Sequence, residues 1–125
     1  MNKPDQLWAE RFFRECLSQL KQGQWTFELT LRELGDGSSY GECGTNTGRQ
    51  HAVVTIHHRL HENVEELTNT LAHEAIEIAG ADLSNYLSAV LQDSCAAYAA
   101  DLVHKIIEPC AAILAKAVHA EVNSD

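Results

Sequence analysis

The stretch Thr70-Leu71-Ala72-His73-Glu74-Ala75-Ile76-Glu77-Ile78-Ala79-Gly80 lies inside a run, Asn63 to Gly80, that has the pattern of a single helix. His73 and Glu77 are four residues apart, so they lie about 40° apart on a helix that advances about 100° per residue. Both side chains can therefore reach one point in space, and Glu74 stands beside His73. This grouping of one imidazole and two carboxylates makes the stretch a candidate metal-binding helix.

The same run has one apolar face and one polar face. The apolar stripe consists of Val64, Leu67, Leu71, Ala75 and Ile78, and the opposite stripe of Glu66, Thr70, His73 and Glu77. A solvated helix face shows the same pattern, so the spacing also allows a structural role for His73 and Glu77. Glu74 borders the apolar stripe, which is an unusual position for a charge, and this position favours a function for it.

The chain before this run predicts one helix followed by three strands. Residues 4–22 carry apolar side chains about every four residues, the pattern of an amphipathic helix. Residues 25–33 alternate between apolar and polar side chains, which is typical of a strand with one buried face. Two further strands are expected at 40–45 and 51–58, each bounded by turn-forming residues. We expect these strands to form an antiparallel meander.

The chain after this run predicts more helix. One helix, capped by Asp82 or Ser84, is expected to continue to about Ile107. Its apolar stripe consists of Leu87, Val90, Leu91, Cys95, Tyr98, Leu102 and Ile106, which we expect to be buried. Pro109 is expected to break or kink the helix, and residues 111–122 form a last helix.

These elements together predict an α+β fold in a single domain, residues 1–125. Its parts are an N-terminal helix, a small three-stranded antiparallel sheet, the motif helix and one or two further C-terminal helices. The alanine-rich residues 96–117 would allow close packing against a neighbouring helix or, in a homo-oligomer, against a second subunit.

Composition narrows the classes of function. The 125 residues carry 9 Lys+Arg against 18 Asp+Glu, a formal charge of −9. This charge argues against direct binding to nucleic acid and leaves open a basic protein partner. The sequence shows neither a signal peptide nor a membrane-spanning run, so we expect a cytoplasmic protein. The four cysteines form no C-x-x-C pair, which favours small buried thiols over a cysteine zinc site.

Several motifs resemble those of the zincin metallopeptidases, whose metal-binding helix carries H-E-x-x-H. Thr70-Leu71-Ala72-His73-Glu74 is similar to a T-L-x-H-E motif of the small metallopeptidase-like proteins of phages and prophages. Tyr40-Gly41-Glu42-Cys43-Gly44 resembles the glycine-cysteine turn or strand of these proteins, and Ala52 to His58 resembles their edge strand. A helix that ends near a proline, here Pro109, follows at a similar distance. The resemblance covers roughly residues 40–109, and Glu77 replaces the second histidine of the motif.

The resemblance implies a role for each motif residue. His73 would be the first metal ligand, and Glu77 would take the place of the second. Glu74 would be the general base that takes a proton from a metal-bound water. The third ligand would be a carboxylate on the following helix, and Asp93 is the best positional match. Zinc is the first choice of metal, and manganese or ferrous iron also suit this oxygen-rich set.

Other side chains could supply the third ligand. Gln92 lies beside Asp93, and three histidines, His57, His58 and His61, lie on or near the strand that precedes the motif helix. His57 and His58 point to opposite faces of a strand, so only one of the two could join the site. His104 lies about three turns beyond Asp93, which is too far along a helix for both to bind one metal directly.

The first functional hypothesis is therefore a zincin-like, metal-dependent hydrolase of peptides. The alternative is a catalytically inactive zincin-like protein, such as one encoded by a phage, whose acidic surface binds a basic protein. A third hypothesis is a helical assembly module that buries its apolar stripes in an oligomer. A cysteine–histidine enzyme built on Cys43 has little support, because no residue is placed to act as its base.

Overall fold

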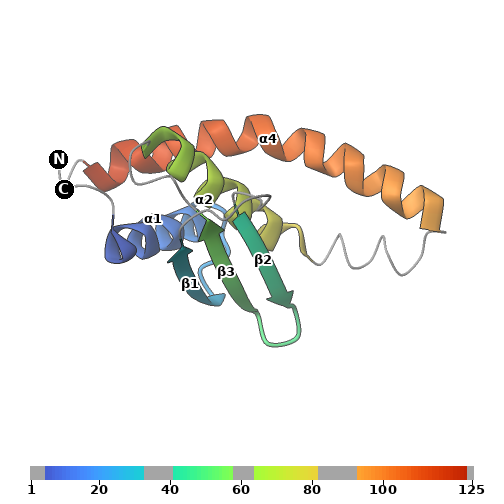
Figure 1. The fold of residues 1–125 in the computed structure, drawn as a ribbon, viewed down its shortest axis with the longest axis horizontal. Helices are drawn as coiled ribbons and strands as arrows, with labels where there is room; N and C mark the ends of the chain where they lie inside the picture. Colours follow the sequence, from blue (N-terminus) through green and yellow to red (C-terminus); the bar gives the residue numbers. More distant parts are fainter. Residues whose placement is uncertain (1–4, 33–40, 58–63, 82–92, 124–125) are drawn as a thin grey trace.

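The computed structural model describes residues 5–32, 41–57, 64–81 and 93–123. In chain order its elements are α1 (Gln6–Gln19), β1 (Thr26–Arg32), β2 (Gly41–Asn46), β3 (His51–His57), α2 (Val64–Ala79) and α4 (Asp93–Asn123) (Figure 1). This content and order confirm the predicted α+β class, with a helix first and the motif helix directly after the sheet.

The three strands form a mixed sheet in the order β1-β3-β2. β2 and β3 pair antiparallel, as expected for neighbours joined by a short turn. β1 pairs with β3 in parallel, from Thr26 opposite His51 to Arg32 opposite His57, so the predicted all-antiparallel meander is wrong in this detail. Alternation identifies which face of a strand is buried but not which strand lies beside it. β3 takes the central place, and its Ala52, Val54 and Ile56 are fully buried.

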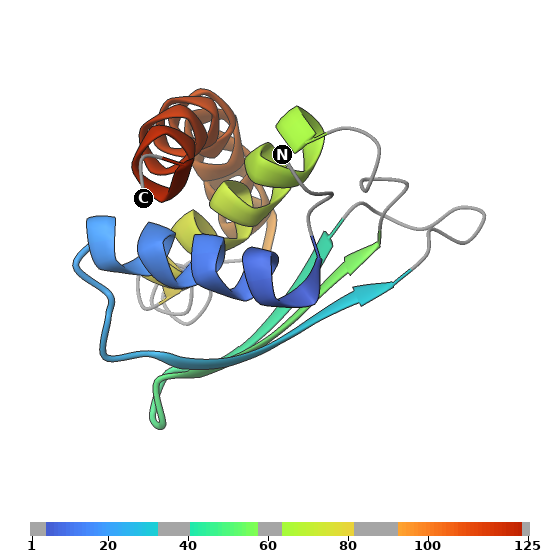
Figure 2. The same ribbon diagram turned by 90° about the vertical axis from the view of Figure 1, so that its left-hand side faces the viewer.

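The described helices lie on one side of the sheet (Figure 2). α1 and α2 pack on the sheet, and α4 packs against both of these helices. The core between the layers is aromatic on the α1 side, where Phe13 meets Phe27 of β1 edge to face with ring centres 4.9 Å apart. The predicted apolar stripe of α2 is confirmed, since Leu67, Leu71, Ala75 and Ile78 are all buried.

α4 is one helix of 31 residues that continues through Pro109. Of the predicted break or kink the break does not occur, and residues 111–122 belong to this same helix, so there is one C-terminal helix of the one or two expected. A proline removes one backbone N–H from the helix, a cost that packing on both sides can offset. Ile107 lies before Pro109, and Ala111, Ala115 and Val118 follow it, and all four are buried. The predicted start of this helix, at Asp82 or Ser84, lies outside the described residues.

The face that α4 turns inward also differs from the prediction. Tyr98, Leu102 and Ile106, which were expected in the core, are 67%, 43% and 65% exposed. The small side chains of Ala111 and Ala115 are the buried ones, which allows α4 to lie close to its neighbours. The N-terminal half of α4 extends past the sheet (Figure 1), so the sheet does not cover the apolar residues there. In the described part of the chain, no helix is long and apolar enough to cross a membrane.

Two leucines of α1 provide a matched test of this packing. Leu17 is 1% exposed in the core and Leu7 is 75% exposed. We expect Leu17→Ala to lower the free energy of unfolding by about 2–5 kcal/mol, because it leaves a cavity. Leu7→Ala should change it by less than about 0.5 kcal/mol. Urea unfolding followed by circular dichroism measures both, and equal losses would contradict the packing of α1.

Candidate functional site

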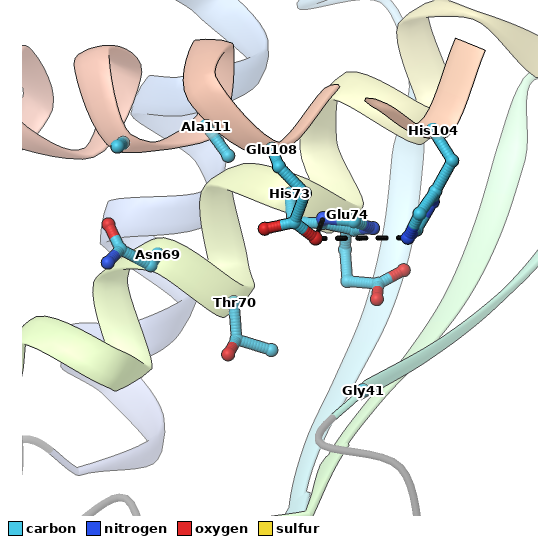
Figure 3. A pocket seen from close by; sticks show the side chains of 9 residues that line it. Gly41, Asn69, Thr70, His73, Glu74, His104, Glu108 and Ala111 are labelled. Carbon is cyan, nitrogen blue, oxygen red and sulfur yellow. Dashed lines mark ion pairs between the residues drawn. The ribbon is translucent and has the colours of Figure 1, made fainter. Parts of the chain in front are cut away.

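A pocket of about 430 Å³ opens between α2, α4 and the start of β2 (Figure 3). The residues that line it are Gly41, Asn69, Thr70, His73, Glu74, His104, Glu108, Ala111 and Ala112. Figure 3 shows His104 and Glu108 of α4 facing His73 and Glu74 of α2 across the pocket. The lining is therefore polar and acidic on both helices, with small side chains beside it.

The packing of α2 directs the motif residues into this pocket. Leu71 and Ala75 are fully buried in the core. The opposite face of the same helix carries Thr70, His73 and Glu77, as the sequence pattern predicted. α4 covers that face and approaches it closely, because Ala111 is small.

The imidazole of His73 lies between two carboxylates. Its Nε2 is 3.2 Å from Oε1 of Glu77, one turn further along α2, and the two form a hydrogen bond. Its Nδ1 is 3.2 Å from Oε1 of Glu108 on α4. Only 15% of the His73 side chain is exposed, so both contacts are partly shielded from water. This one side chain links the two helices.

His104 adds a second imidazole beside the first. Its Nε2 is 3.8 Å from Oε1 of Glu108, and its Nδ1 is 3.9 Å from Oε1 of Glu77. The rings of His73 and His104 meet edge to face, with centres 5.0 Å apart. Two imidazoles and two carboxylates thus alternate around one small region, each helix supplying one of each kind.

Glu74 is the most buried charged group of the pocket, with 4% of its surface exposed. Burial raises the pKa of its carboxyl from the ordinary 4.5 to about 8, and the nearby charge of Glu77, a hydrogen bond with Glu77 and the charge of Glu42 add to the effect. Its Oε2 is buried without a hydrogen-bond partner. A buried carboxyl oxygen without a partner lowers the stability of the folded state unless a proton or a cation binds to it.

β2 runs very close to this carboxyl group. A Cβ placed on Gly41 would lie 2.9 Å from Oε1 of Glu74 and 3.0 Å from Cγ2 of Thr70. Any larger residue at position 41 would therefore have to displace the Glu74 side chain. The absence of a side chain at Gly41 is what lets the start of β2 form one wall of the pocket.

Within the described part of the chain, two groups of three donor atoms are compact enough to hold one metal ion. They are the set His73, His104 and Glu108 and the set His73, Glu74 and Glu77, and within each set the donor atoms lie within 4.8 Å of one another. The first set has two imidazoles and one carboxylate, the composition of a common catalytic zinc site. The second has one imidazole and two carboxylates, as the motif predicted.

The structure brings together part of the predicted site. His73, Glu74 and Glu77 converge, as their spacing on one helix predicts. Asp93 is the first residue of α4, about 16 Å along the helix axis from His104, so it is distant from the part of α4 that lines the pocket. Its role as a ligand stays a prediction, because its side chain lies outside the described part of the structure.

Of the alternative third ligands, only His57 belongs to the described residues. Gln92, His58 and His61 are outside the described residues. His57 is on β3, where its Nε2 is 3.7 Å from Oε1 of Glu42, and it does not line the pocket.

The sequence interpretation missed Glu108 and gave His104 no part in the motif site. One signal in the sequence could have found both, because His104 and Glu108 repeat the four-residue spacing of His73 and Glu77. That spacing predicts a shared helix face for each pair. It does not predict that the two faces meet.

Cys43 faces the same carboxylates but is unsuited to nucleophilic chemistry. Burial raises the pKa of its thiol to about 12, and the charges of Glu74 and Glu77 add to this. A thiol in this state is almost wholly protonated near neutral pH and reacts slowly. Cys16, Cys43 and Cys110 are free thiols, and Cys110 is exposed, against the expectation of buried cysteines.

Comparison with known proteins adds no assignment: no family model, curated protein or solved structure matches the chain. The candidate site therefore rests on the residues and geometry described above.

The raised pKa of Glu74 makes stability depend on pH in the metal-free protein. The folded state keeps a proton on Glu74 up to a pH of about 8, whereas the unfolded state loses it near the ordinary 4.5. Between these values the folded state binds the extra proton, so its stability falls as pH rises, by up to about 1.4 kcal/mol per pH unit. Glu74→Gln should remove this part of the slope.

Urea unfolding in the presence of EDTA at pH 5.5, 6.5 and 7.5 measures the effect. The exposed Glu65 of the same helix supplies the control, Glu65→Gln, which should keep the slope of the unmodified protein. Equal slopes for Glu74→Gln and the unmodified protein would show that Glu74 does not hold its proton in the folded state.

Proposed function

We propose that this chain is a divalent-metal-binding protein with a zincin-like active-site helix, α2, and that it hydrolyses peptide bonds. The observation that supports the proposal is the convergence of His73, His104 and Glu108 beside Glu74, a buried carboxyl group with an unpartnered oxygen. Zinc is the preferred metal, because two imidazoles and one carboxylate leave a fourth position open for substrate or water. Ferrous iron or manganese also suit this donor set.

The donor set and the pocket fit such an ion. The three side chains come from two helices that pack together, so the folded structure brings them together before any ion binds. The pocket beside them has room for part of a substrate. A divalent ion held there would supply Lewis acidity, polarising a carbonyl group and lowering the pKa of a water molecule.

Glu74 has the position and the acid–base properties of a general base. It lines the same pocket as the proposed ligands, and a carboxyl group whose pKa lies near the working pH is well suited to take up and return a proton. The positive charge of a bound ion would lower the pKa of Glu74 and favour the form that accepts a proton. Burial excludes bulk water from competing for that proton.

The charge of the pocket favours an uncharged substrate group. Among the residues that the structure describes, its lining includes Glu74 and Glu108 and no lysine or arginine. A phosphate ester would meet these carboxylates without a compensating side chain, whereas the amide of a peptide carries no charge. The formal charge of −9 on the whole chain acts in the same direction. A peptide is therefore a better fit than a nucleic acid or a phosphorylated metabolite.

A second candidate is a non-catalytic protein that binds a partner, and the exposed apolar side chains of α4 favour it. Leu102 is 43% exposed, and Tyr98, Ile106 and Ile113 are each more than 60% exposed. Such residues are uncommon on a surface that has no partner. In this case a metal would hold α2 and α4 together without turnover, and the acidic charge would favour a basic protein.

Metal content separates these functions from a merely solvated cluster. Protein treated with EDTA and then given zinc should retain one zinc ion per chain, measured by elemental analysis after gel filtration. Zinc at about a hundred times its Kd should raise the free energy of unfolding by about 2.7 kcal/mol. His73→Ala and His104→Ala should each lose this gain. His51→Ala, which removes a histidine from the sheet instead, should keep it.

Turnover separates the enzyme from the binding protein. The zinc-loaded chain should cleave unstructured peptides, detected by mass spectrometry of the products. Glu74→Gln should keep the zinc, because it leaves the ligands in place. Its rate of peptide cleavage should fall by about 10²- to 10⁴-fold, because the substitution removes the base. Zinc binding without peptide cleavage would favour the second candidate. A protein that holds no zinc, manganese or iron would contradict the metal centre itself.

A further inference from the structure

We propose that Glu77 is a positioning residue and not a metal ligand, and that Nδ1 of His73 is the nitrogen that binds the metal, together with His104 and Glu108. This inference rests on the metal centre proposed above and assigns the roles of its residues. It departs from the motif, in which position 77 is occupied by a ligand. The contacts of His73 carry the argument.

The two ring nitrogens of His73 have different neighbours. Nε2 forms a hydrogen bond with Glu77, and the geometry of one helix fixes this contact, because the two residues are one turn apart. Both ring nitrogens lie 3.2 Å from a carboxylate oxygen. An imidazole that binds a metal is neutral and carries its one hydrogen on the other nitrogen. Glu77 is hydrogen-bonded to Nε2 and can accept that hydrogen, which leaves the lone pair of Nδ1 for the ion, on the side of Glu108. A metal can bind only a ring nitrogen that has a free lone pair.

The distances around Glu108 suit shared coordination. Its Oε1 lies 3.2 Å from Nδ1 of His73 and 3.8 Å from Nε2 of His104. Two donor atoms bound to one tetrahedral zinc ion at about 2.0–2.2 Å lie roughly 3.4 Å apart. Both distances from Oε1 of Glu108 lie near this value, and the donor atoms of the three residues lie within 4.8 Å of one another.

Glu77 is placed differently from Glu108. It belongs to a compact donor set with His73 and Glu74, whereas Glu108 forms one with both imidazoles. Glu77 also lies near enough to Glu74 to help raise the pKa of that carboxyl group, so it acts on the metal-binding histidine and on the proposed base at once. Carboxylates that hold the second nitrogen of a metal-binding histidine are common in metal sites, and losing one typically costs 10- to 100-fold in metal affinity.

Substitutions at positions 77 and 108 distinguish a positioning carboxylate from a ligand. We expect Glu77→Ala to bind one zinc ion with an affinity 10- to 100-fold lower than that of the unmodified chain. Glu77→Gln should lose less zinc affinity than Glu77→Ala, because its amide oxygen still accepts the Nε2 hydrogen bond. Glu108→Gln should lose more zinc affinity than Glu77→Ala does, because an amide oxygen is a poor zinc ligand. Glu65→Ala, a matched change on the exposed side of α2, should bind as the unmodified chain does.

Zinc affinity is measured by competition with a chromogenic chelator, and circular dichroism confirms that each variant is folded. Nitrogen-15 NMR of the zinc-loaded, unmodified chain gives a second measurement that needs no substitution. In that spectrum Nδ1 of His73 should carry the shift of a metal-bound nitrogen, and Nε2 that of a protonated one.

Three results would overturn the inference. The first is an NMR spectrum in which Nε2 of His73 is bound to zinc. The second is loss of zinc binding in Glu77→Gln while Glu108→Gln retains it, which would make Glu77 the ligand and favour the set with Glu74. The third is unchanged affinity in Glu77→Ala. In all three the protein still binds zinc, so the proposed function would survive. If the unmodified chain binds no zinc, both this inference and the proposed metal centre are wrong.

Discussion

The burial of the apolar face of α2 is the constraint on which the rest of the structure depends. Leu67, Leu71 and Ala75 have no measurable exposure, and this fixes the rotation of the helix against the sheet and α1. Once the rotation is set, the opposite face has one direction left, toward α4 and the pocket. The orientation of His73 and Glu77 follows from this rotation, because their positions on the helix are fixed relative to those of the buried residues. Glu74, between the two faces, is buried for the same reason and carries the cost of a desolvated carboxyl group.

The sequence predicted those parts of the molecule that depend on local geometry. The amphipathic pattern of α2 and the convergence of His73 with Glu77 both follow from the period of one helix. The parts it missed depend on how distant segments meet. Strand alternation does not report that β1 lies parallel to β3. Similarly, the apolar pattern of α4 predicts that Leu102 faces the core, whereas the helix buries Ala111 and Ala115 and places the half-exposed His104 at the pocket.

The carboxylates of the site repel one another, which lowers the stability of the fold unless a proton or a cation binds among them. Glu74, Glu77 and Glu108 lie around two histidines in a chain that already carries a charge of −9. Burial, with the nearby charge of Glu77, raises the pKa of Glu74, which favours a proton on this carboxyl group in the metal-free fold. A proton satisfies one carboxyl oxygen, whereas a divalent cation interacts with several donors at once. Clusters in which the charges conflict in this way are typical of functional sites.

Compared with the H-E-x-x-H motif that the sequence of α2 resembles, the proposed centre divides its ligands between two helices. A histidine at position 77 would place both imidazoles on α2, and the motif helix alone would then hold most of the ligands. Here the second imidazole of the proposed centre, His104, belongs to α4. A carboxylate at position 77 can then hold His73 in place, which a ligand at that position could not do. As a consequence, any motion of α4 relative to α2 changes the distances from His73 to His104 and to Glu108. The affinity for metal and the packing of these two helices are therefore coupled, and whatever stabilises one stabilises the other.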